Sequence, residues 1–136
     1  MELITDRTES DALLGNEKGT YSYTDLNRVE AAVGEIAALF PVLGTSLMLT
    51  TKTDWGAPGA FSAAEWPVAS QMQRYLGNVV AIKNTFGIPV QLPVSMTRLT
   101  WSGANNIEKI LQIAMIRATN TIQTFRYSGE IYSGEE

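Results

Sequence analysis

The sequence contains neither cysteine nor histidine, and these two absences exclude much catalytic chemistry. Without cysteine the chain has no thiol nucleophile, no thiolate zinc site and no ligand for an iron–sulfur cluster. Without histidine it has no Ser-His-Asp triad and no imidazole that exchanges a proton near neutral pH. Carboxylate metal sites and hydrolases that use a pair of carboxylates stay open at this point.

Basic residues are also scarce, because 10 Lys and Arg stand against 14 Asp and Glu, giving a net charge of −4. Nucleic-acid binding rests on a basic surface that displaces counterions from phosphates, so we expect no nucleic-acid partner. No apolar run reaches the about 18–20 residues that a membrane-spanning helix needs, so we expect no membrane span. The acidic start of the chain lacks the basic and apolar segments of a signal peptide.

The carboxylates do not form the pair that acid–base chemistry needs. Glu30 and Glu35 are five residues apart and do not share a helix face well, and Glu108 beside Lys109 is typical of solvated surface. The glycine-containing segment 56–59 lacks the Lys-Ser/Thr that completes a phosphate-binding loop. We therefore predict that the protein is not an enzyme and carries no metal and no cofactor.

What the chain does contain is enough apolar mass for a core, since 45% of its 136 residues are hydrophobic. This length suits one domain. We expect an N-terminal arm or short helix over residues 1–20, a helical bundle over 21–126 and an extended C-terminal tail over 127–136. In the tail, Tyr-Ser-Gly-Glu occurs twice, and its pattern favours an extended arm or a small hairpin.

Apolar residues recur at spacings of three and four along three segments, the pattern of one buried helix face. Thr24 and Asp25 open the first segment. Its apolar residues are Leu26, Val29, Val33, Ile36, Phe40 and Leu43. The second segment runs from about residue 70 to 86, and the third from about 100 to 125 with a stripe made of Ile107, Leu111, Ala114, Ala118, Ile122 and Phe125. The fold class is therefore predicted as mainly α, a three-helix bundle with short extra elements and an extended C-terminal arm.

Two features are candidates for a contact surface. Ile113 and Ile116 lie off the predicted buried stripe of the third helix, and exposed apolar residues mark interfaces. The alternative is that short elements of the chain itself cover them. Tyr127 and Tyr132, with neighbouring glycines, resemble the composition of adaptable recognition surfaces, whereas the alternative is a tail that docks on its own domain.

Asp54 and Trp55 form a candidate ligand loop. An Asp beside a Trp can bind a sugar through ring stacking and carboxylate hydrogen bonds, which makes a glycan one candidate partner. The alternative is that the Trp closes one end of the bundle and the Asp caps a turn.

Several segments resemble a family of small proteins encoded in phages and prophages of Gram-positive gut bacteria, labelled as tail-associated or minor structural proteins. The resembling segments are residues 21–30, 52–55, 72–79, 93–96 and 104–111, and the double Tyr-Ser-Gly-Glu tail. They follow one another in order over most of the chain.

The resemblance implies a virion component made in the host cytoplasm, in the tail, the baseplate or a fibre-attachment point. It supplies no catalytic residues. Its expected partners are other virion proteins and further copies of the chain. The alternatives are a carbohydrate-binding module that recognises a host surface and a small phage-encoded regulator of a host protein.

Overall fold

The computed structural model describes residues 2–56 and 69–134, and for residues 125–134 the backbone alone. The described part is mainly helical and contains no strand. Its helices are α1 (Glu9–Leu14), α2 (Tyr23–Ala37), α3 (Phe40–Leu43), α4 (Ala69–Phe86) and α5 (Trp101–Gly134). The prediction of a mainly helical bundle is confirmed, and the three predicted long segments correspond to α2 with α3, α4 and α5.

The first two helices begin at capping boxes, in which the residue before the helix and the third helical residue exchange hydrogen bonds. Thr8 and Asp11 form the box of α1, and Gly15 ends that helix in the left-handed conformation, at φ 63°. In α2 the carboxylate of Asp25 accepts a hydrogen bond of 2.8 Å from the backbone N–H of Ser22. This helix therefore begins earlier than Thr24, because Asp25 caps it from the third helical position.

The first predicted apolar seam runs along α2 and the short α3. Its residues are buried from Leu26 to Phe40, and Leu43 is half-buried. Pro41 lies in the first turn of α3, where its missing N–H costs no hydrogen bond. Gly44 ends the helix at φ 79°, a conformation that residues with a side chain rarely adopt.

Helices α4 and α5 are joined by a loop of residues 87–100. Gly87 ends α4 at φ 62°. The guanidinium of Arg117 donates a hydrogen bond of 2.5 Å to the last carbonyl of α4, at Phe86, so α5 caps the C-terminal end of its neighbour. The hydroxyl of Thr100 accepts from the N–H of Gly103 at 3.0 Å and caps the start of α5.

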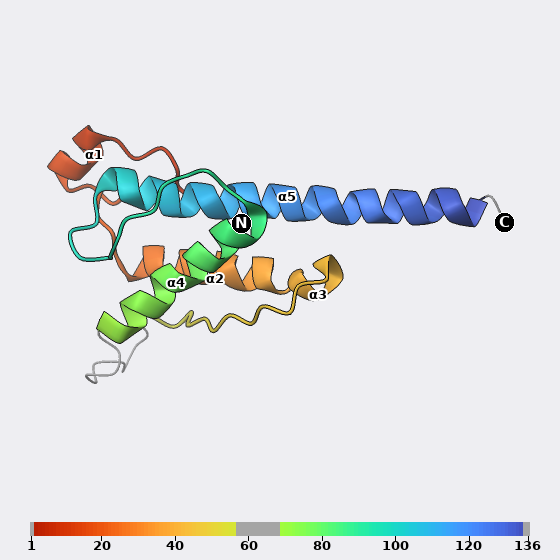
Figure 1. Cartoon of the computed structure of the whole chain (residues 1–136). Coiled ribbons are helices and arrows are strands. Elements are labelled where there is room, and N and C mark those ends of the chain that lie inside the picture. Colours follow the sequence, from red (N-terminus) through yellow and green to blue (C-terminus); the bar gives the residue numbers. More distant parts are fainter. Residues whose placement is uncertain (1, 57–68, 135–136) are drawn as a thin grey trace.

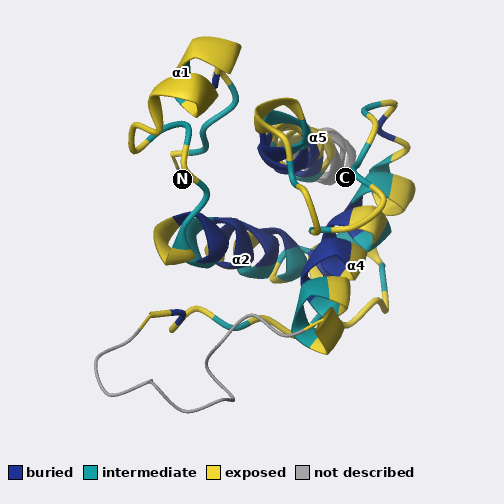
Figure 2. Cartoon of the chain, turned by 90° about the vertical axis from the view of Figure 1, so that its left-hand side faces the viewer, coloured by how far each residue is buried: buried dark blue, intermediate teal, exposed yellow. Residues whose placement is uncertain are grey.

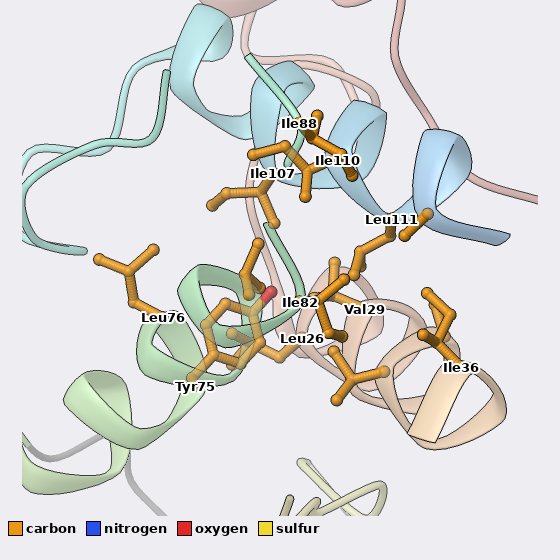
Figure 3. Packing of buried hydrophobic residues seen from close by; sticks show 14 of the residues in the cluster. Leu26, Val29, Ile36, Tyr75, Leu76, Ile82, Ile88, Ile107, Ile110 and Leu111 are labelled. Atoms are coloured by element: carbon orange, nitrogen blue, oxygen red, sulfur yellow. The ribbon is translucent and has the colours of Figure 1, made fainter. Parts of the chain in front are cut away.

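One apolar core lies between α2, α4 and α5, with each helix turning its buried side inward (Figure 2). Side chains from all three helices point into the same space (Figure 3). Its fully buried members include Val29, Ile36, Tyr75, Val79, Ile82, Ile107, Ile110 and Leu111. The buried stripe predicted for the third helix is confirmed from Ile107 to Ala118. Ile110 and Ala104 widen it.

The predicted C-terminal tail has a different backbone from the one expected. Residues 127–134 continue α5 as helix, so the tail is neither an extended strand nor a hairpin. Helix propagation adds one hydrogen bond for each residue fixed, and no proline interrupts it after residue 93. At about 1.5 Å per residue, the 34 residues of α5 extend for about 50 Å, and its C-terminal half projects beyond the other helices (Figure 1).

The last prediction from the sequence concerns the membrane. None of the described helices combines the length and the apolar character that crossing a bilayer requires.

We predict that Ile107→Ala lowers the free energy of unfolding by about 2–5 kcal/mol, since it leaves a cavity where the three helices meet. Val42→Ala, at an exposed position of α3, should change it by less than about 0.5 kcal/mol. Urea unfolding followed by circular dichroism measures both. Equal losses in the two variants would contradict the position of the core.

Candidate functional site

Four charged residues form a buried ion-pair cluster between the N-terminal arm (residues 2–8), α2 and α5. We call Arg7, Asp25, Arg28 and Glu108 the arginine cluster. Arg7 Nη2 lies 2.6 Å from Glu108 Oε2 and 3.2 Å from Asp25 Oδ1. Arg28 binds the same two carboxylates, with its Nε 2.6 Å from Glu108 Oε1. The Glu108 side chain is 0% exposed.

Main-chain and amide groups complete the hydrogen bonds of the arginine cluster. The Asn105 side chain accepts from the N–H of Arg7 at 3.0 Å and donates to its carbonyl at 2.9 Å. Glu108 accepts a further bond from the N–H of Ile4, and Arg7 donates to the carbonyls of Ile4 and Lys18. Among the described residues, no buried side-chain nitrogen or oxygen lacks a hydrogen-bond partner. The cluster thus fastens the N-terminal arm to two helices.

The arrangement of these charges is that of a structural ion-pair network. Two guanidinium groups balance two carboxylates, and hydrogen bonds from Arg28 to Glu108 and Asp25 hold the pKa of Arg28 above its ordinary value. The expectation that Glu108 is solvated surface is wrong, because its side chain is 0% exposed. Each carboxylate is held by a permanently charged arginine and is positioned for structure rather than for proton transfer.

Two tyrosines lie against the arginine cluster. The hydroxyls of Tyr21 and Tyr75 are hydrogen-bonded to each other, and the guanidinium of Arg7 lies 5.6 Å from the centre of the Tyr21 ring. Burial raises the pKa of both phenols above the ordinary value. The pair joins the segment before α2 to the core face of α4.

A third buried carboxylate, outside the arginine cluster, holds the segment that follows α3. Glu30, 1% exposed, accepts hydrogen bonds from the indole N–H of Trp55 and from Arg74 Nη1, the latter at 2.6 Å. Asn27 binds the main chain of Trp55 in both directions, at 2.8 and 2.9 Å. Arg74 also donates to the carbonyl of Thr50 at 2.8 Å. Residues 50–55 are therefore fixed across α2 and α4 by polar contacts.

The contacts of Glu30 and Asn27 with Trp55 determine where the candidate ligand loop lies. Trp55 is 2% exposed, with Lys52 lying 5.1 Å from its ring centre. Asp54 is exposed and pairs with Lys52 at 2.6 Å. Because the indole is buried, it offers no open ring face on which a sugar can stack, and the structure places Trp55 as a closing residue of the bundle.

The four predicted contact residues lie in different surroundings. Ile113 is half-buried and packs against the core of its own chain, so it belongs mainly to the fold. Ile116 is 55% exposed. The backbone positions of Tyr127 and Tyr132 belong to the helical end of α5, and their side chains lie outside the described residues.

The last part of α5 has little cover from the rest of the chain. Among the residues of α5 whose side chains are described, up to residue 124, Ala118 is the last fully buried one, and from 119 to 124 every residue except the half-buried Ile122 is exposed. We call residues 119–134 the projecting half of α5. Figure 1 shows it extending past α2, α3 and α4.

An open apolar groove of about 350 Å³ lies along α4 and the loop before α5. We call it the α4 groove. Its apolar lining is made of Met72, Leu76, Val80, Val94 and Met96, and none of its lining residues is charged. Val94 is fully exposed. The projecting half of α5 and the α4 groove are the two surfaces that we consider for binding.

Comparison with protein-family models, curated proteins and solved structures finds no match. Within the described ranges, no group of three or more acidic side chains is placed to hold a metal ion.

Sequence reasoning missed the arginine cluster for a physical reason. Arg7 and Glu108 are far apart in the chain from each other and from the neighbouring pair Asp25 and Arg28, and a charged residue is ordinarily solvated. One local signal existed, since the helical positions of Glu108 and Leu111 are three apart and therefore share one side of α5.

We predict that Glu108→Gln lowers the free energy of unfolding by about 3–5 kcal/mol, because the buried guanidinium of Arg7 and the half-buried one of Arg28 are left with one carboxylate. The matched control is Glu17→Gln, an exposed position, with an expected change below about 0.5 kcal/mol. Chemical denaturation checks both. A loss below about 1 kcal/mol in Glu108→Gln would show that the cluster is not buried as described.

The tyrosine pair predicts a fall in stability at alkaline pH. Its folded pKa values lie above the unfolded value near 10, so the unfolded state releases these protons first. The contribution of the pair to the free energy of unfolding is therefore constant below pH about 10. It falls as the pH rises above that value. In a spectrophotometric titration, the difference between the natural chain and Tyr21→Phe/Tyr75→Phe should show two phenols that ionise only on unfolding. Ionisation near pH 10 in the folded state would contradict their burial.

Proposed function

We propose that this protein is a structural subunit of a phage virion, in the tail, the baseplate or a fibre-attachment point. It acts through contacts with further copies of itself and with other virion proteins, without catalysis. It is made in the host cytoplasm and carried in the virion. The observation that carries the proposal is the projecting half of α5, a helix that leaves the bundle with a continuing apolar stripe.

A helical segment of this length that no partner covers is only marginally stable in water. Isolated helices shorter than about 12–15 residues are barely stable even when rich in alanine, and packing of an apolar face supplies most of the helical stability in proteins. The projecting half contains Thr119, Thr121 and Thr124, which are poor helix formers, and Gly129. Such a segment gains stability when a partner packs against it.

The sequence of the projecting half keeps the pattern of a contact face. Ala118, Ile122, Phe125, Gly129 and Tyr132 follow at spacings of 4, 3, 4 and 3, the repeat of a helix packed along one seam. The same stripe is buried in the bundle up to Ala118. The side chains from Phe125 onward lie outside the described residues, so their part in the seam is a prediction from their position.

The bundle gives the projecting helix a fixed direction. Glu108, in the buried part of α5, is held by Arg7 and Arg28, and Arg117 binds the end of α4. A rigid bundle with one projecting helix suits a building block, because each copy presents its contact in the same orientation. The order and extent of the segments that resemble phage tail-associated proteins support a place in a phage virion.

We predict that light scattering of the full chain, over a wide concentration range, gives a discrete mass above that of one chain. Ile122→Glu should weaken self-association at least about 30-fold, because it places a charge in the seam. Gln123→Glu adds the same charge at an exposed neighbouring position and should leave the mass unchanged.

Circular dichroism confirms that the bundle of each variant is folded. The mass of a single chain at every concentration would contradict self-association. Dissociation by Ile116→Glu but not by Ile122→Glu would move the contact to the exposed side of α5.

A further inference from the structure

Residues 45–49 lie apart from the α4 groove and the projecting half of α5, on the side of α2 that faces away from α5 (the yellow trace in Figure 1). We call them the open segment. At its start, the N–H of Thr45 donates to the carbonyl of Phe40 at 3.0 Å. Directly after it, the carbonyl of Thr50 accepts from the side chain of Arg74 at 2.8 Å. The open segment is therefore fixed at both ends and runs along the outside of the bundle.

The main chain of the open segment is free to form hydrogen bonds with a partner. Its backbone continues to residue 54 without a turn or a bend. Within the described part of the chain, no N–H or C=O group of residues 46–49 has a hydrogen-bond partner. A straight run of free main-chain groups is the template with which a further β-strand pairs. The loop of residues 87–100 is a poorer template, because Pro89 and Pro93 each lack a donor.

The open segment also lacks the features by which proteins keep an exposed strand from pairing, which are charged side chains and prolines. Residues 36–51 contain no charged residue, and no proline follows Pro41 within them. Met48 is 92% exposed, whereas Leu49 packs against the core. An open hollow of about 410 Å³ lies between the open segment and the ends of α2 and α3, and it leaves room beside the segment.

We infer that the open segment binds the same segment of a second copy, as an antiparallel pair of β-strands. The free main chain identifies the chemistry of the partner, because an extended chain offers N–H and C=O groups in the matching order. The lack of charge favours a second copy, because self-pairing places no like charges opposite each other. Such a pair has a two-fold axis, the commonest symmetry of protein oligomers.

The ladder geometry limits the register of this pair. Opposite residues in an antiparallel pair are either both hydrogen-bonded or both not, so the two-fold axis passes through a residue that faces its own counterpart. With Met48 at the axis, Leu47 of one copy lies opposite Leu49 of the other, and these apolar side chains pack across the strands. This contact uses a different surface from the projecting half of α5 and does not depend on it.

Disulfide trapping tests the contact, because the natural chain contains no cysteine. Opposite Cα atoms in an antiparallel pair are about 4.5 or 5.5 Å apart, a separation that a disulfide spans. Met48→Cys should therefore crosslink two copies under mild oxidation. Thr53→Cys is the control at an exposed position, because it is five residues from the axis and lies far from its counterpart. Denaturing electrophoresis without reductant measures the rate at which the crosslinked dimer forms.

Two prolines test whether main-chain hydrogen bonds hold the pair. Ser46→Pro and Leu47→Pro are each combined with Met48→Cys, and circular dichroism confirms that the bundle is folded. Neither N–H has a partner within the described chain, so neither proline removes a hydrogen bond of the single copy. The N–H groups of neighbouring strand residues point to opposite edges. One proline should therefore slow the crosslink about 10-fold or more, and the other should leave it nearly unchanged.

We expect Met48→Cys to crosslink at least about 10-fold faster than Thr53→Cys. Equal rates for these two variants would overturn the inference. Equal effects of the two prolines would overturn it as well, because strand pairing uses the N–H groups of alternate residues. Ile122→Glu leaves the open segment unchanged and should keep the crosslink. A failure of the proposed α5 contact and a failure of strand pairing are therefore distinguished.

Discussion

The buried ion pair between Arg7 and Glu108 is the contact on which the arrangement of the bundle depends. It joins the N-terminal arm to α5, and Arg28 extends it to α2. Burying charges is costly, and this cost is offset only when every charge is paired and hydrogen-bonded. The cluster meets that condition. It therefore defines one relative position of arm, α2 and α5, whereas apolar side chains alone tolerate several packings.

The same principle operates around Glu30, which fixes residues 50–55 through Trp55 and Arg74. The arginine cluster and Glu30 fasten segments that flank the helices, while the apolar core fixes the helices to one another. The result is a bundle in which polar contacts hold the N-terminal arm and residues 50–55 in place. Helix α5 has a substantial part outside the bundle and extends away from it in one direction (Figure 1). This contrast between a fastened bundle and an uncovered helix is what supports a role in assembly.

The helices could be predicted from the sequence because apolar spacing of three and four reports a buried face directly, as it does for Val29 and Ile107. The polar contacts could not, because residues such as Arg7 and Glu108 are distant in the chain and each one alone resembles solvated surface. Trp55 is open to two interpretations from the sequence, and the burial of its indole against Glu30 favours a closing residue over a sugar-binding ring. The repeated Tyr-Ser-Gly-Glu motif led to an extended tail as the prediction, whereas the backbone continues as helix to residue 134.

Hydrogen exchange of the natural chain at low and high protein concentration tests the central claim, that another copy covers the projecting half of α5. The account predicts that amides of residues 119–134 exchange rapidly in dilute solution and become protected at high concentration. Identical exchange of residues 119–134 at both concentrations would contradict the account.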